Sequence, residues 1–158
     1  MNIFVLHRDP STAAAMMCDK HIIKMVLETN QMLCTVASAQ GYQAPYKPTH
    51  ATHPCTLWAA ETMQNWNWLL QHSRALCSEY TRRYNRTHKS QAVTEWAEGL
   101  DIELPNMGQT PFRLAMPAKY QSEDAVTSYR AYYLGEKSGF AKWKLGNVPS
   151  WWVIDEGP

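Results

Sequence analysis

One stretch, residues 18–33, limits what this chain can fold into more than any other. At 3.6 residues per turn it is apolar in most directions, as expected of a buried helix. One narrow stripe is polar, and its four members fall within roughly 80° of arc: His21, Lys24, Glu28 and Gln31. Burying an acid, a base and an imidazole together is costly unless they pair or react. We therefore interpret the stripe either as a Lys24–Glu28 ion pair beside a hydrogen-bonded core histidine or as the wall of a functional cleft.

Helix signals alternate with proline-rich segments along the chain. Asp9-Pro10 begins a helix expected over about 11–39, long enough to contain a break. Further helices are expected over about 56–84, over 91–98 and from Ser122 to about Lys137. Prolines make loops of 41–55 and 100–120, segment 2–6 is expected to be extended, and Trp151-Trp152 forms a docked plug or an exposed aromatic clamp. The sequence thus predicts a mainly α, single compact domain over 1–158, with about four to five helices and long Pro-rich loops.

Composition narrows the class of protein. The formal charge is +1 over 158 residues, so any nucleic-acid binding must use a local basic patch. Seven Trp and eight Tyr can pack a core or stack on bases. The four cysteines form no CxxC pair, and we find neither a secretory signal nor a membrane-spanning run, which predicts a cytosolic protein with reduced thiols.

Two clusters of potential metal ligands offer an alternative role. Cysteine and histidine are the usual ligands of zinc, and they occur here as Cys18 and His21 and as His50, His53 and Cys55. The spacing is not that of a standard zinc finger, and the histidines can equally hydrogen-bond the Pro-rich loop or line a cleft. No glycine-rich phosphate loop is present, and no cofactor is expected.

Cations crowd the end of the second long helix. Arg82, Arg83, Arg86, His88 and Lys89 lie there, and positive charge complements the negative end of a helix dipole. The same cluster is also suited to contacting phosphates.

Two motifs resemble a known family. The pattern Asp19-x-His21-x6-Glu28, close to an N-terminus that begins Met-x-Ile, is similar to that of the phage and bacterial pyrimidine-dimer DNA glycosylases. Tyr46-Lys47-x2-His50-x2-His53-Pro54-x2-Leu57 resembles their histidine–proline loop, and a helix ending in Arg82-Arg83-Tyr84 follows it. This resemblance covers roughly the first 85 residues. Nearly the whole chain, with Thr110-Pro111-Phe112 and Ala115-Met116-Pro117, also resembles a protein set common in tailed-phage genomes.

The resemblance implies a mechanism. In that family the α-amine of the chain attacks C1′ of a damaged nucleotide to form a Schiff base, and a glutamate assists base loss and strand cleavage. Here Glu28 and His21 match the family's residues. The amine belongs to Met1, because Asn2 is bulky enough for methionine to stay, or to Asn2 if methionine is removed. Leu27 stands where the family has an arginine, so a modified base, or DNA binding without cleavage, remains an alternative to dimer excision.

We therefore expect N-glycosylase/AP-lyase-like action on duplex DNA, in the host cytoplasm if the protein is phage-encoded. The expected catalytic residues are Glu28, His21, Met1, Asn2 and Lys24. The expected substrate-binding residues are Lys20, Gln31, His50, His53, Arg82, Arg83, Arg86, Lys89, Tyr129 and Arg130. Two other classes remain open. One is a protein that binds or degrades a small nucleotide in counter-defence, favoured by the near-neutral charge and the aromatics. The other is a zinc-stabilised interaction module.

Overall fold

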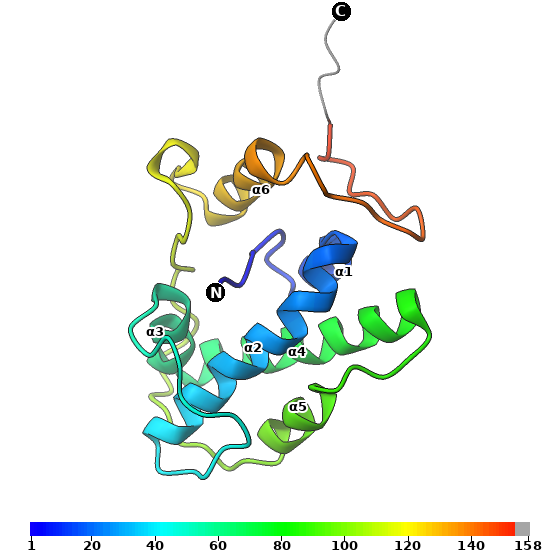
Figure 1. The fold of residues 1–158 in the computed structure, drawn as a ribbon. Coiled ribbons are helices and arrows are strands. Elements are labelled where there is room, and N and C mark those ends of the chain that lie inside the picture. The colour runs from blue at the N-terminus through cyan, green and yellow to red at the C-terminus, as the bar shows by residue number, and fades with distance from the viewer. Residues whose placement is uncertain (154–158) are drawn as a thin grey trace, which may run out of the picture.

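The computed structural model describes residues 1–153, and every regular element in that part of the chain is helical (Figure 1). The six α-helices and one 3₁₀ helix are α1 (Pro10–Met16), α2 (Asp19–Ala39), α3 (Pro54–Glu61), α4 (Met63–Tyr84), α5 (Gln91–Glu98), η1 (Ala118–Tyr120) and α6 (Ala125–Glu136). This confirms a mainly α, single compact domain. The number of helices is slightly higher than predicted, because each of the two long helices is divided.

Extended backbone divides each of the two long helices, and a side-chain cap starts the helix after the second division. Asp9 Oδ2 accepts a hydrogen bond from the Thr12 amide at 2.8 Å to start α1, and the backbone at Met17 and Cys18 is extended before α2 begins. Thr62 is also extended, with φ −141° and ψ 161°, and its Oγ1 accepts from the Asn65 amide to start α4. A capping oxygen satisfies an otherwise unpaired amide of the first turn, so the break at Thr62 stabilises α4, whereas Cys18 precedes α2 without a side-chain cap.

The two helices predicted after residue 90 correspond to α5 and α6. α5 spans the predicted residues 91–98, and α6 ends within a residue of Lys137. The cap of α6 is Asp124 and not Ser122: the Asp124 carboxylate accepts from the Thr127 amide at 2.9 Å. The prediction placed this start two residues too early, because Ser122 and Asp124 are both good N-cap residues and lie two positions apart.

The helices pack around α2 and α4. α1 lies on α4, whereas α3 and α5 each contact both α2 and α4. Segment 2–6 is buried but forms no ladder of strand hydrogen bonds, and it enters the molecule between α2 and α6, so the N-terminus lies in the interior of the ribbon (Figure 1). Trp151 and Trp152 are partly buried and meet the ring of Tyr133 edge-on, as a docked plug would. Within the described residues, no helix combines the length and the apolar character needed to cross a membrane.

Candidate active site

The N-terminal amine lies against the polar stripe of α2. The Met1 nitrogen is 3.0 Å from Glu28 Oε1, in a cavity of about 160 Å³. Glu28 Oε2 is buried and has no hydrogen-bond partner among residues 1–153, and Lys24 Nζ lies 3.8 Å from it. The cavity is lined by Met1, Asn2, Phe4, His21, Lys24, Met25, Glu28, Tyr132 and Lys137. A carboxylate with a free oxygen beside an amine is a pair that can exchange a proton.

Asn2 holds the amine in place. Its Oδ1 accepts from the amides of Ile3 and Phe4 at 2.7 and 3.0 Å, and its Nδ2 donates to the Ala115 carbonyl at 2.8 Å. Phe4 adopts a left-handed backbone with φ 57°, which is unusual for a bulky residue and is maintained only when the surroundings impose it. The Asn2 side chain is thus occupied in positioning the chain terminus.

His21 lines the same cavity and is 6% exposed. Its ring stacks on Phe4 with centroids 4.4 Å apart, and Nδ1 lies 2.6 Å from the hydroxyl of Tyr133. Burial, together with the ammonium groups of Lys137, Lys24 and Lys20, lowers the pKa of His21 to about 3. The imidazole is therefore neutral at pH 7, which excludes it as a cationic acid.

Three lysines surround the cavity and His21. Lys24 and Lys20 are exposed on α2, and Lys20 Nζ lies 4.9 Å from the centre of the Phe140 ring. Lys137 follows α6, and its Nζ lies 4.6 Å from the centre of the Tyr132 ring. Sequence reasoning missed Lys137 and Tyr132. The reason is that nothing in the local sequence shows that this turn of α6 faces the N-terminus.

The histidine loop contributes one side chain to this region. His53 caps α3, with Nδ1 accepting from the Cys55 amide at 3.1 Å. Burial lowers the pKa of His53, and the positive charges of the N-terminal ammonium and of His50 lower it further. The His53 ring therefore lies close enough to Met1 for the two charges to interact. His50 is exposed, has a left-handed φ of 51°, and pairs with Thr49 Oγ1 at 2.9 Å.

Residues expected to bind substrate through α4 have diverse environments. Arg83 is completely buried and pairs with Glu79 and Asp19 at 2.9 and 3.1 Å, so it joins α4 to the start of α2. Arg82 is exposed and pairs with Glu79. Arg86 and Lys89, which were also expected to contact phosphates, are exposed. Only the exposed cations of this cluster are available to a phosphate.

The other expected substrate contacts also differ in environment. Tyr129 is buried and donates its hydroxyl proton to the Arg113 carbonyl at 2.7 Å. Arg130 donates to the Leu6 carbonyl at 2.9 Å, which holds segment 2–6 against α6. Gln31 is partly buried one turn beyond Glu28 and does not line the cavity.

The proposed zinc ligands do not converge. Among residues 1–153 there is no group of three or more His, Cys, Asp or Glu side chains arranged to hold a metal ion. Cys18 Sγ lies 3.4 Å from the Tyr133 hydroxyl, whereas Cys55 Sγ lies 4.0 Å from Asn2 Oδ1. Burial raises the pKa of the Cys55 thiol to about 11, which disfavours the thiolate that zinc requires.

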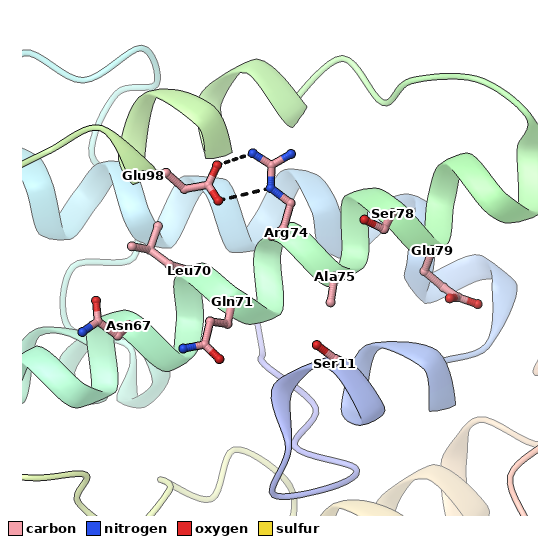
Figure 2. A pocket seen from close by; sticks show the side chains of 9 residues that line it. All are labelled: Ser11, Asn67, Leu70, Gln71, Arg74, Ala75, Ser78, Glu79 and Glu98. Carbon is pink, nitrogen blue, oxygen red and sulfur yellow. Dashed lines mark hydrogen bonds and ion pairs between the residues drawn. The ribbon is translucent and has the colours of Figure 1, made fainter.

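A second hollow, of about 620 Å³, lies between α1, α4 and α5 (Figure 2). Its charged groups neutralise one another: Arg74 of α4 pairs with Glu98 of α5, as Figure 2 shows, and Glu79 is held by Arg82 and Arg83. The lining is Ser11, Asn67, Leu70, Gln71, Arg74, Ala75, Ser78, Glu79 and Glu98, with no aromatic ring for a base to stack on. This groove has the volume of a ligand site without unpaired groups that converge.

Comparison with known proteins identifies the family. The sequence model of the pyrimidine dimer DNA glycosylase family matches residues 1–92, which contain Met1, His21, Glu28 and His53. No curated protein and no solved structure matches the chain. Because the family match spans more than half of the 158 residues, this chain belongs to the pyrimidine dimer DNA glycosylase family.

Proposed function

We propose that this protein is a DNA N-glycosylase with AP-lyase activity, in which the α-amine of Met1 is the nucleophile and Glu28 the acid/base. The observation that carries this proposal is the 3.0 Å contact between that amine and Glu28 Oε1 inside the small cavity. An α-amine is well suited to the role because its ordinary pKa is lower than that of lysine, so more of it is unprotonated at neutral pH.

In this proposal the contact begins a sequence of proton and bond changes. Glu28 takes a proton from the Met1 ammonium, and the freed lone pair attacks C1′ of a nucleotide extruded from the stack. As the nitrogen–C1′ bond forms, the glycosidic bond breaks and the base leaves with its electron pair. The nitrogen then loses a proton to the departing base, and protonated Glu28 gives its proton to the ring oxygen as the sugar ring opens. This yields the protonated imine and restores the Glu28 carboxylate. Removal of a C2′ proton by the Glu28 carboxylate then expels the 3′-phosphate and cuts the strand.

The cavity size favours DNA over a free nucleotide as the substrate. A volume of about 160 Å³ is below the roughly 300–1,000 Å³ typical of small-molecule sites. It suits the sugar carbon of a nucleotide whose base and phosphates lie outside. The base must leave the duplex stack to expose C1′, at a cost of roughly a few kcal/mol that is smaller for a damaged base.

Cations at the mouth supply the phosphate contacts in this proposal. Lys20, Lys24 and Lys137 surround His21, and the exposed Arg86 and Lys89 lie at the end of α4. With a formal charge of only +1, affinity has to come from such a local patch, and each phosphate contact adds to the salt dependence of binding. Tyr132 and Lys137 lie beyond residue 92 yet line the cavity, which supports one functional domain over 1–158.

Borohydride trapping on a duplex with one abasic site tests the proposal. The protein, with its free Met1 amine confirmed by mass spectrometry, should form a covalent adduct that maps to the peptide containing Met1. The same protein with its α-amine selectively acetylated should form none. An adduct on Lys20 or Lys24, or equal trapping after acetylation, would remove the α-amine mechanism. If no adduct forms, small-nucleotide ligands should be screened next.

A pyrimidine dimer is the first lesion to test, because it gives the family its name. Cleavage of one glycosidic bond of the dimer should precede strand cleavage on that duplex, with the freed base still joined to its neighbouring pyrimidine. Cleavage of the abasic duplex without action on the dimer would keep the amine chemistry and assign the protein to another modified base. Leu27, 40% exposed on α2 beside Lys24, is the place to look for that difference.

A further inference from the structure

We propose that Tyr133 is a positioning residue that fixes the tautomer of His21, so that a neutral imidazole presents Nε2–H to the ligand in the cavity. This inference rests on the proposed function for its catalytic consequence, although the tautomer itself can be measured in the free protein. Tyr133 lies in α6, outside residues 1–92, and is completely buried.

The hydrogen bonds of the Tyr133 hydroxyl leave two arrangements. The Cys18 amide donates to the Tyr133 hydroxyl oxygen at 3.1 Å, because a backbone N–H can only donate a hydrogen bond. The single hydroxyl proton then goes either to His21 Nδ1, at 2.6 Å, or to Cys18 Sγ, at 3.4 Å. If it goes to sulfur, His21 carries its proton on Nδ1; if it goes to nitrogen, His21 carries its proton on Nε2.

Distance and acceptor strength decide between them. The separation of 2.6 Å is shorter than the typical N–H···O distance of about 2.7–3.2 Å, and it resembles the distance of about 2.5–3.0 Å that is typical when a hydroxyl donates to oxygen. Imidazole nitrogen is also a much stronger acceptor than a thiol sulfur. The hydroxyl therefore donates to Nδ1, and the proton of the neutral ring lies on Nε2.

Packing then directs Nε2 toward the cavity. Phe4 stacks on one face of the ring, and Phe140 and Tyr133 meet it edge-on at centroid distances of 5.7 and 5.1 Å. Within residues 1–153 Nε2 has no hydrogen-bond partner, and His21 lines the cavity that holds the amine. A donor held there can bond to the ring oxygen of the sugar as the C1′–oxygen bond opens. It keeps its proton, because a neutral imidazole is too weak an acid to give it up.

His72 supplies an internal reference for the measurement. Its Nδ1 lies 2.9 Å from the Pro10 carbonyl, which can only accept, so His72 must carry its proton on Nδ1. Nitrogen-15 NMR of the free protein at neutral pH should therefore show opposite tautomers for the two buried histidines.

Removal of the Tyr133 hydroxyl tests the inference, with Tyr129→Phe as the matched control. Both tyrosines lie in α6 and are completely buried, but the Tyr129 hydroxyl bonds to backbone at Arg113 and Ala115. Tyr133→Phe should shift His21 toward the other tautomer and slow borohydride trapping at saturating abasic DNA roughly 5- to 10-fold, with the half-saturating DNA concentration unchanged. Tyr129→Phe should leave the His21 tautomer unchanged, because it keeps the contact between the Tyr133 hydroxyl and His21.

Two results would overturn the inference. One is a His21 that carries its proton on Nδ1 in the unmodified protein; the other is an unchanged His21 spectrum in folded Tyr133→Phe. Both are measured without substrate, so they are distinct from failure of the amine mechanism, which would show as absence of trapping in the unmodified protein.

Discussion

The two hollows of this protein are opposite in kind. The groove between α1, α4 and α5 is large, at about 620 Å³, yet Arg74 pairs with Glu98 there and Glu79 pairs with Arg82 and Arg83. The cavity between α2, α6 and the N-terminal segment is about 160 Å³, yet it contains an α-amine and a buried carboxylate oxygen that no group in the described part of the chain hydrogen-bonds. Reactivity follows unpaired groups that converge, whatever the volume around them.

Backbone strain distinguishes the two regions as well. Phe4, whose ring lines the small cavity, has a left-handed φ of 57°. The groove is lined by residues of regular helices, together with the ion pairs that join them. Strained backbone and unpaired polar groups reduce stability and tend to gather where a protein functions. We therefore expect substitutions in the cavity to reduce activity, and substitutions around the groove to reduce stability.

The largest contrast is expected between two glutamates. Glu28→Gln removes the proton acceptor while keeping the shape of the side chain, and should slow adduct formation on abasic DNA by roughly 10²- to 10⁴-fold. Glu98→Gln, in the groove, should leave the rate unchanged, because its carboxylate only pairs with Arg74 at the surface. Timed borohydride trapping at saturating DNA measures both. Equal rates of adduct formation for the two variants would show that the small cavity is no more important for the reaction than the groove.

Two neighbouring arginines test the structural side of the comparison. Arg83→Met leaves the carboxylates of Glu79 and Asp19 without their buried partner and should reduce the free energy of unfolding by about 3–5 kcal/mol. Arg82→Met removes an exposed member of the same network and should cost less than about 1 kcal/mol. Urea unfolding at pH 7 gives both values. A loss in Arg83→Met no greater than in Arg82→Met would mean that the buried network is not what joins these helices.

Acid should destabilise both regions through one buried histidine each. Burial lowers the pKa of His72, beneath α1, to about 4, and that of His21, at the cavity, to about 3. The unfolded chain takes up these protons near pH 6.5 and the folded chain does not. Stability is therefore full above pH 6.5 and falls as the pH is lowered, until the folded values are reached. Between pH 7.5 and 4.5 each histidine should contribute about 2 kcal/mol of loss.

Variants separate the two contributions to that slope. His72→Gln should flatten the dependence of unfolding free energy on pH by about 2 kcal/mol over this interval, measured against its own value at pH 7.5. His50→Gln, at an exposed position, should leave the slope unchanged. A slope unaffected by His72→Gln would show that this ring is protonated in the folded protein.

The smallest effect is expected from single cations. Lys137→Gln should weaken duplex DNA binding a few-fold at low salt and reduce the salt slope by about 1. Arg74→Gln, in the groove, should leave both unchanged, because its guanidinium is already paired with Glu98. Fluorescence anisotropy over a salt series measures both variants. A reduced slope in Arg74→Gln would place DNA on the groove face and reverse the comparison.

Local signals predicted much of the fold and the centre of the site. The polar stripe of α2 identified His21, Lys24 and Glu28, all of which line the cavity. The range of α5 and the start of α1 after Asp9 were also predicted correctly, since capping and helical periodicity depend on residues within a turn or two. Local pattern could not distinguish Arg83 from Arg82, because adjacent positions on a helix differ by 100° and only packing decides which is buried.

The sequence by itself therefore determined the helices, the stripe and the family motifs, all of which are written in residues close together along the chain. Only the tertiary structure decided what faces the amine. His21 and the Tyr133 hydroxyl that contacts it are 112 positions apart, and Asn2 and its Ala115 partner 113. Such contacts arise because burying the N-terminal segment between α2 and α6 is favourable for the whole core. The spacing of residues along the chain does not indicate which turn of α6 lines the cavity.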